Sequence, residues 1–180
     1  MITDMDITND LIKLIIESLN TFVRDDIILL DRMVSERALC GALMLKIHTN
    51  LQRTAFAEYY VDVEFNKSMQ LKGNEYIYDL KRLPNGKYIS TDIIVHGRGM
   101  GVVPDNLIAI EMKRKINGGE RYKTKRAADI QRLKDLTNPN YMYQYLLGAF
   151  VEIDFKDRQI GLKLFKSGEE LDMNIERIKF

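Results

Sequence analysis

The chain has 180 residues and nearly balanced charge, with 27 Lys or Arg against 26 Asp or Glu. This length suits one domain with a sizeable core, and the single cysteine, Cys40, excludes an internal disulfide framework. No apolar run is long enough to cross a bilayer, and the acidic, polar N-terminus is not typical of a secretory signal. We therefore expect a cytoplasmic protein with no membrane attachment.

Two helices are predicted at the start of the chain. Residues 9–24 carry apolar residues at helical spacing over a wide face, which either packs on the core or serves as a homodimer surface. Residues 35–53 form the second helix. Ser35 is its expected N-cap, and Glu36 lies in its first turn, where the helix dipole favours a negative charge.

The rest of the chain alternates between strands and one further helix. An amphipathic helix is expected over residues 125–136, and the Asn-Gly pair in residues 83–87 indicates a hairpin turn in a polar stretch. Alternation and β-propensity predict five strands, at residues 59–65, 88–96, 106–113, 141–155 and 159–165. This order indicates an α/β protein of the α+β-like kind, with a central mixed sheet flanked by helices.

The strand at residues 106–113 runs from an apolar core segment, 107–110, directly into charge. Alternation places Glu111 and Lys113 on the same side of the sheet. Burying a lone carboxylate costs several kcal/mol, roughly, unless a cation or hydrogen-bond donors compensate it. If the preceding strand is a neighbour, Asp92 can converge with Glu111, and a divalent cation would neutralise the pair. Such oxygen ligands suit Mg²⁺ or Mn²⁺.

The triplet of an acidic residue, any residue and a lysine is a weak motif by itself, because charged residues are common. The triplets at 79–81 and 154–156 also fit it. Only Glu111 follows a buried strand and has Asp92 on the strand before it. The competing interpretation is a surface ion pair where the strand leaves the core.

This arrangement resembles the signature of the PD-(D/E)XK nuclease superfamily. Asp92 is followed by an 18-residue gap and then by Glu111-Met112-Lys113 at the end of an apolar strand. Thr91 stands where the family pattern has proline, and Glu36 lies where the family often keeps a further acid. The resemblance covers residues 33–165 and extends to three other positions, Glu64, His96 and Arg98.

The resemblance implies a fold and roles for individual residues. It implies a restriction-endonuclease-like core in residues 33–180, after an N-terminal helical extension in residues 1–32. Asp92, Glu111 and the Met112 carbonyl would hold Mg²⁺ or Mn²⁺. Lys113 would orient or activate the attacking water. Glu36 would hold a metal-bound water or a second ion, and Glu64 is an additional candidate metal ligand.

A basic block supports a polyanionic substrate. Residues 113–134 contain nine Lys or Arg against two acids, which gives a local net charge of +7. Such a block is either a solvated face or the footprint of a phosphate backbone. We expect residues 117–125 to form a mobile loop that orders on the substrate. The candidate contacts to nucleic acid are Arg98, Arg114, Lys115, Arg121, Lys123, Lys125 and Arg126.

These observations favour a metal-dependent nuclease that hydrolyses phosphodiester bonds, with DNA favoured over RNA. The alternative is a non-catalytic nucleic-acid-binding or adaptor protein on the same scaffold. Two smaller features have structural explanations that compete with binding. His96 would make a structural hydrogen bond or contact phosphate. Three alternating tyrosines, at 141, 143 and 145, are expected in the core rather than stacked on bases.

Overall fold

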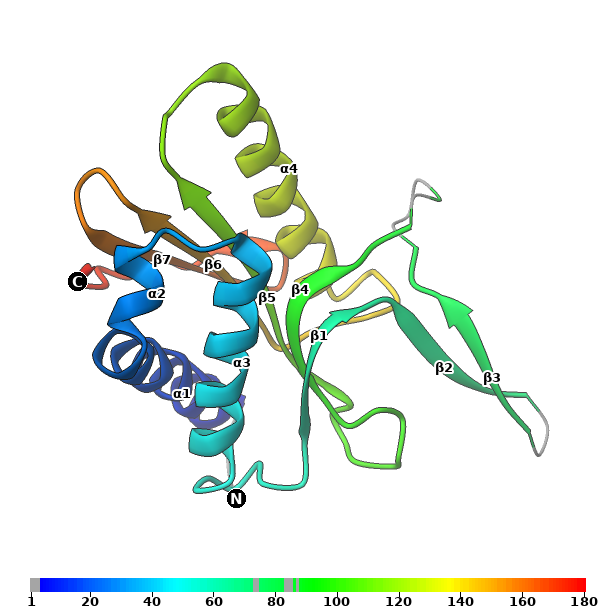
Figure 1. Cartoon of the computed structure of the whole chain (residues 1–180). Coiled ribbons are helices and arrows are strands. Elements are labelled where there is room, and N and C mark those ends of the chain that lie inside the picture. The colour runs from blue at the N-terminus through cyan, green and yellow to red at the C-terminus, as the bar shows by residue number, and fades with distance from the viewer. Residues whose placement is uncertain (1–3, 73–74, 83–85, 87) are drawn as a thin grey trace.

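The protein is described by a computed structural model that covers residues 4–72, 75–82, 86 and 88–180. Its helices lie on the two faces of a central sheet (Figure 1): α1 (Asp4–Asp25), α2 (Ile27–Asp31) and α3 (Glu36–Leu51) on one face and α4 (Glu120–Thr137) on the other. Within those ranges, no helix combines the length and the apolar character that crossing a membrane requires.

The central sheet has seven strands and is mostly antiparallel. Its order is β1-β4-β5-β6-β7-β8, and β9 also pairs with β7. The one parallel pair joins β5 to β6, and α4 forms the crossover between them. The strands are β1 (Tyr60–Phe65), β4 (Thr91–His96), β5 (Asn106–Lys115), β6 (Leu147–Asp154), β7 (Gln159–Lys166), β8 (Glu169–Glu170) and β9 (Ile178–Lys179). The predicted mixed sheet with flanking helices is confirmed.

Alternation along β4 and β5 divides the core into two layers. Ile93 and Ile110, which are paired in the sheet, pack in the layer that holds α1 and α3. Ile94 and Ala109, the next pair, pack in the layer that holds Leu133 of α4. Because successive side chains point to opposite faces, Glu111 lies on the α4 face.

The apolar face of α1 is covered within the chain. Leu11, Leu19 and Phe22 are fully buried and share one core with α3 and the sheet. Packing on the core therefore accounts for this face without a second copy. The homodimer and the division of the chain at residue 32 stay predictions, but α1 is not a detached appendage. The predicted cap of α3 is confirmed, because the Ser35 hydroxyl accepts from the Ala38 amide.

The stretch between β1 and β4 contains two strands that were not predicted. β2 (Lys67–Lys72) and β3 (Glu75–Leu80) form a separate antiparallel pair that projects beside the main sheet (Figure 1). β2 and β3 satisfy each other's backbone hydrogen bonds without joining the central sheet. No long apolar run therefore indicates them in the sequence. The expected Asn-Gly turn at 83–87 lies mostly outside the described residues.

The strand predicted over residues 141–155 is wrong in its first half, because β6 begins at Leu147. Gln144 has a φ of 46°, a left-handed conformation that a strand does not accommodate. Tyr143 and Tyr145 are nevertheless buried, as predicted, whereas Tyr141 is only half-buried. The hydroxyls of Tyr143 and Tyr145 contact Arg82 N at 2.6 Å and Lys81 Nζ at 2.7 Å.

The mobile loop expected over residues 117–125 is largely helical. α4 starts at Glu120, with Gly119 as its N-cap residue. Glu120 in the first turn suits the helix dipole, and Lys123 pairs with it at 2.7 Å. The Gly pair at 118–119 thus precedes the helix.

Lys81 is a buried feature of the core that predicts a pH-dependent stability. Its side chain is buried among aromatic rings, and burial lowers the pKa of its ammonium from 10.5 to about 8. The unfolded chain therefore binds more protons between pH 8 and 10.5, so this residue makes stability rise with pH across that window. Below pH 8 the buried charge is destabilising.

We expect Lys81→Met to remove this pH dependence. The unfolding free energy of the wild type, relative to that of Lys81→Met, should rise by about 3 kcal/mol between pH 7 and pH 10.5. Denaturant unfolding at several pH values measures it, with Lys13→Met on the exposed side of α1 as the control. Parallel curves for the wild type and Lys81→Met would contradict the assignment.

Candidate functional site

The two acids of the motif lie on neighbouring strands. β4 and β5 are antiparallel, and the register that pairs Ile93 with Ile110 brings Asp92 beside Glu111. The Asp92 carboxylate accepts a hydrogen bond from the Met112 amide at 2.7 Å. The Met112 side chain points the other way, with its sulfur 3.8 Å from the sulfur of Cys40. The backbone of Met112 is therefore the part of that residue that faces Asp92.

Lys113 and Glu36 join this pair from β5 and α3. Lys113 Nζ lies 3.3 Å from Glu36 Oε1 and 2.9 Å from Asp129 Oδ2. The other Glu36 oxygen accepts from the Arg114 amide at 3.0 Å. Burial alone would lower the pKa of Lys113, but Asp129 and Glu36 outweigh it and raise that pKa. Lys113 is therefore a firmly held cation at neutral pH.

Glu111 is the most buried acid of the group, with a side chain that is 2% exposed. Arg132 of α4 compensates its charge, with Nη1 2.6 Å from Oε1. Burial and then the charge of Asp92 raise the pKa of Glu111 well above its usual range, against the opposing effect of Arg132. Burial is also the main cause of the raised pKa of Asp92. Two carboxylates are thus held close together with incomplete compensation.

Asp129 and Arg132 were not identified from the sequence. They lie one turn apart on α4, and Arg132 Nη1 is 3.4 Å from Asp129 Oδ1. Asp129 is 6% exposed and belongs to the same buried stripe as Leu133 and Leu136. A carboxylate on the apolar stripe of an amphipathic helix is a signal that sequence reasoning can detect. Its partners, however, come from another element.

Glu64 lies close to the acids but is engaged by Arg37. The two form a bidentate pair, with distances of 2.8 and 3.1 Å. Glu64 has a φ of 50°, a left-handed conformation inside β1 that costs energy for a residue with a side chain. It borders a cleft of about 320 Å³, lined by Ser35, Glu36, Arg37, Cys40, Val63, Glu64 and Asp92. The acids of β4 and α3 therefore open onto a hollow of the surface.

His96 and Arg98 are held by one carboxylate away from this cluster. Asp62 of β1 lies 2.9 Å from His96 Nε2 and 2.8 Å from Arg98 Nε. His96 is 2% exposed, and burial lowers its pKa. The Arg98 guanidinium lies over the Tyr60 ring, 4.2 Å from its centre. A structural role accounts for His96.

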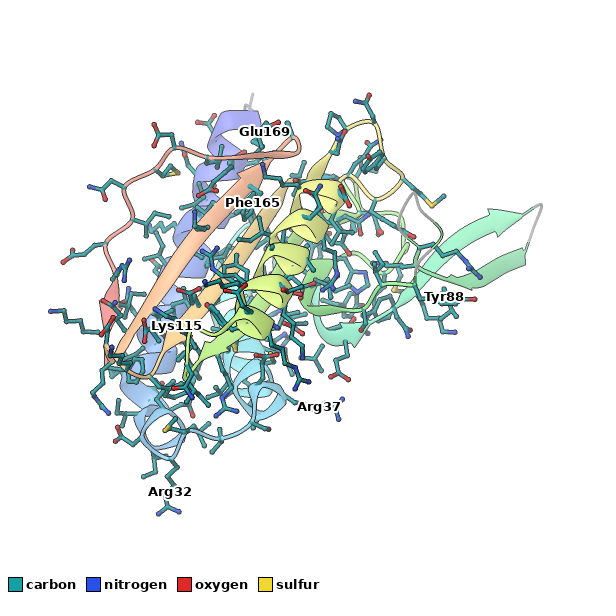
Figure 2. The ribbon with its side chains drawn as sticks, turned by 90° about the horizontal axis from the view of Figure 1, so that it is seen from above. Arg32, Arg37, Tyr88, Lys115, Phe165 and Glu169 are labelled. Carbon is teal, nitrogen blue, oxygen red and sulfur yellow. The ribbon has the colours of Figure 1, made fainter. Side chains whose placement is uncertain are left out.

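Five of the seven predicted nucleic-acid contacts have partners inside the chain, and for Lys123 that partner is the exposed Glu120 on the same helix. Figure 2 views the molecule with α4 in front of the strands and labels Lys115 at the end of β5. Lys115 lies 2.6 Å from Asp154, and Arg126 lies 2.8 Å from Glu152. Arg114 donates to the Met33 carbonyl and lies over the Phe155 ring. Arg121, Lys123 and Lys125 are exposed on the first half of α4.

Asp92 and Glu111 are chemically suited to bind a hard divalent cation, and they would supply two side-chain ligands. Asp92 and Glu111 offer carboxylate oxygens, which Mg²⁺ and Mn²⁺ prefer. In the ranges that the structure covers, no three His, Cys, Asp or Glu side chains are arranged to bind a metal ion. Water and phosphate oxygens commonly complete the shell of Mg²⁺, so two carboxylates are compatible with such a site.

Comparisons with protein-family models, with curated proteins and with solved structures found no match. The resemblance to PD-(D/E)XK nucleases accordingly rests on the motif residues and on their positions in the fold. Four of those residues, Glu36, Asp92, Glu111 and Lys113, gather at one end of the β4–β5 pair.

We expect Asp92→Asn to stabilise the protein in the presence of a chelator. The amide oxygen can still accept from Met112, whereas the charge that burial and Glu36 disfavour is gone. The unfolding free energy at pH 7.5 should rise by roughly 0.5–2 kcal/mol, the range of common stabilising substitutions. Denaturant unfolding measures it, with Asp10→Asn at an exposed position as the control. A loss of stability would show that the charge of Asp92 is well compensated.

Proposed function

We propose that the protein is a metal-dependent nuclease that hydrolyses phosphodiester bonds, with DNA as the favoured substrate. The observation that carries this proposal is the gathering of Glu36, Asp92, Glu111 and Lys113 from α3, β4 and β5. The position of Asp92 and Glu111 on adjacent antiparallel strands supports a restriction-endonuclease-like core. So does Glu36 at the start of the helix before the first strand.

Asp92, Glu111 and the Met112 carbonyl would hold Mg²⁺ or Mn²⁺. Burial, and then neighbouring carboxylates, raise the pKa of both carboxyls and so disfavour their charged forms, and a divalent cation would stabilise those charges. When bound, such an ion acts as a Lewis acid toward a phosphoryl oxygen and offsets the charge that develops there. Glu36 lies 3.3 Å from Lys113 and borders the cleft that Asp92 also lines.

Lys113 would act as a cation rather than as a proton acceptor. Its ammonium is paired with Glu36 and Asp129, which keep its pKa raised. A protonated amine cannot take a proton from water, but it can donate hydrogen bonds to phosphate oxygens or orient a water molecule. Its side chain is 14% exposed, so this donor is held in a partly desolvated place.

The exposed cations of α4 would supply attraction for the phosphate backbone. Arg121, Lys123 and Lys125 face solvent on the first half of this helix and would contact phosphates without sequence preference. Lys123 would have to give up only its exposed pair with Glu120 on the same helix, whereas a second group, Arg114, Lys115, Arg126 and Arg98, would first have to exchange partners on other parts of the chain for phosphate. We therefore expect the second group to contribute less to binding.

The alternative is a non-catalytic nucleic-acid-binding or adaptor protein on the same scaffold. The ion pair between Arg132 and Glu111 favours it, because a cation of the chain already occupies one oxygen of the key acid. This alternative predicts binding that weakens with salt, no cleavage, and no gain in affinity from a metal ion.

The nuclease proposal is tested by incubating DNA and RNA with the protein and Mg²⁺ or Mn²⁺. We expect cleavage that excess chelator abolishes and that Lys113→Ala and Asp92→Ala each reduce by about 100-fold or more. Lys156→Ala is the matched control, because Lys156 belongs to another acidic-x-Lys triplet and is exposed. Cleavage that survives both substitutions would reject the proposal, and salt-sensitive binding without cleavage would favour the alternative.

A further inference from the structure

We propose that Arg132 and Asp129 of α4 are positioning residues of this site, which hold Glu111 and Lys113 in the geometry that a divalent cation and a phosphate require. The inference rests on the proposed function and assigns roles to two residues outside the motif. Both come from the crossover helix rather than from the strands that carry the acids.

Arg132 fixes Glu111 through one of its two carboxylate oxygens. Its Nη1 lies 2.6 Å from Oε1 of Glu111, in a place where that side chain is 2% exposed. A carboxylate can bind a cation through its other oxygen, so Oε2 can ligate a metal ion while the ion pair with Arg132 persists. Ligating carboxylates in metal sites are commonly held in this way by outer hydrogen bonds.

Asp129 couples Arg132 to Lys113. Its Oδ1 lies 3.4 Å from Arg132 Nη1, and its Oδ2 lies 2.9 Å from Lys113 Nζ. Opposite charges therefore alternate along a chain of ion pairs, in the order Glu36, Lys113, Asp129, Arg132 and Glu111. Because a buried charge without a partner is costly, each member restricts the side-chain conformation of the next.

A purely structural ion pair would need only the arginine and the buried glutamate. Here Asp129, which pairs with Arg132 on α4, also holds the lysine, and Asp92 lies beside the glutamate that Arg132 fixes. Asp129 and Arg132 are three positions apart on a helix of 18 residues, so one rigid element sets the distance between both held groups. This double attachment is what a positioning role requires.

The test is a calorimetric titration of the full chain with Mn²⁺. We expect Arg132→Gln to weaken Mn²⁺ binding by about 10-fold or more, the usual effect of losing an outer partner of a ligand. Arg132→Lys keeps the charge and should recover part of that loss. Lys134→Gln is the matched control, because Lys134 is also on α4 and pairs with Glu169 at 3.6 Å. Its affinity should stay within twofold of the wild type.

Asp129→Asn gives a second measurement, because Asp129 contacts Arg132 and Lys113 but neither proposed side-chain ligand. We expect it to weaken Mn²⁺ binding at least threefold and to lower kcat, and it decides the matter if Arg132→Gln does not fold by circular dichroism. Wild-type affinity in the folded variants overturns the inference and leaves the nuclease proposal standing. A wild-type protein that binds no Mn²⁺ overturns both.

Discussion

The compensation of one buried charge organises this part of the fold. Glu111 is on a strand whose neighbours are apolar, and its carboxylate is almost completely removed from water. An isolated ionised group there would be very costly. Arg132 of α4 compensates this charge, with its Nη1 2.6 Å from Oε1 of Glu111. The ion pair therefore ties the crossover helix to β5 and fixes how α4 lies on the sheet.

The rest of the cluster is not explained by stability. Asp92 and Glu111 each carry a raised pKa, chiefly because of burial, and Asp92 adds to that of Glu111. A chain selected only for stability has no reason to place a second carboxylate beside the first, since repulsion between them disfavours the folded state. Stability given up in this way is typical of functional sites. This is the physical reason for preferring a site over a strand-end ion pair.

Much of the fold could be predicted from periodicity, because α1, α3, β4 and β5 bury regular apolar patterns. The same alternation predicted that Glu111 and Lys113 share a face. What failed depends on contacts between distant residues. β2 and β3 pair with one another rather than with the core, and the left-handed Gln144 ends an extended pattern that the tyrosines suggested. Asp129 was not identified from the sequence although it lies on an apolar stripe, and its partner Lys113 is visible only once α4 packs on β5.

The electrostatic role of the basic block also depends on contacts that the sequence does not reveal. Its nine cations in residues 113–134 look like a single footprint for phosphate, yet the fold divides them by what they face. Lys113, Lys115, Arg126 and Arg132 each meet a carboxylate of the chain, so their charge is largely cancelled before any substrate arrives. At the start of α4, Arg121 and Lys125 are exposed and Lys123 pairs only with the exposed Glu120, so these cations are the best placed to attract a polyanion at long range. In the proposed nuclease, attraction of the substrate by that helix and chemistry at the β4–β5 end would therefore depend on different residues, linked through the helix that Arg132 anchors.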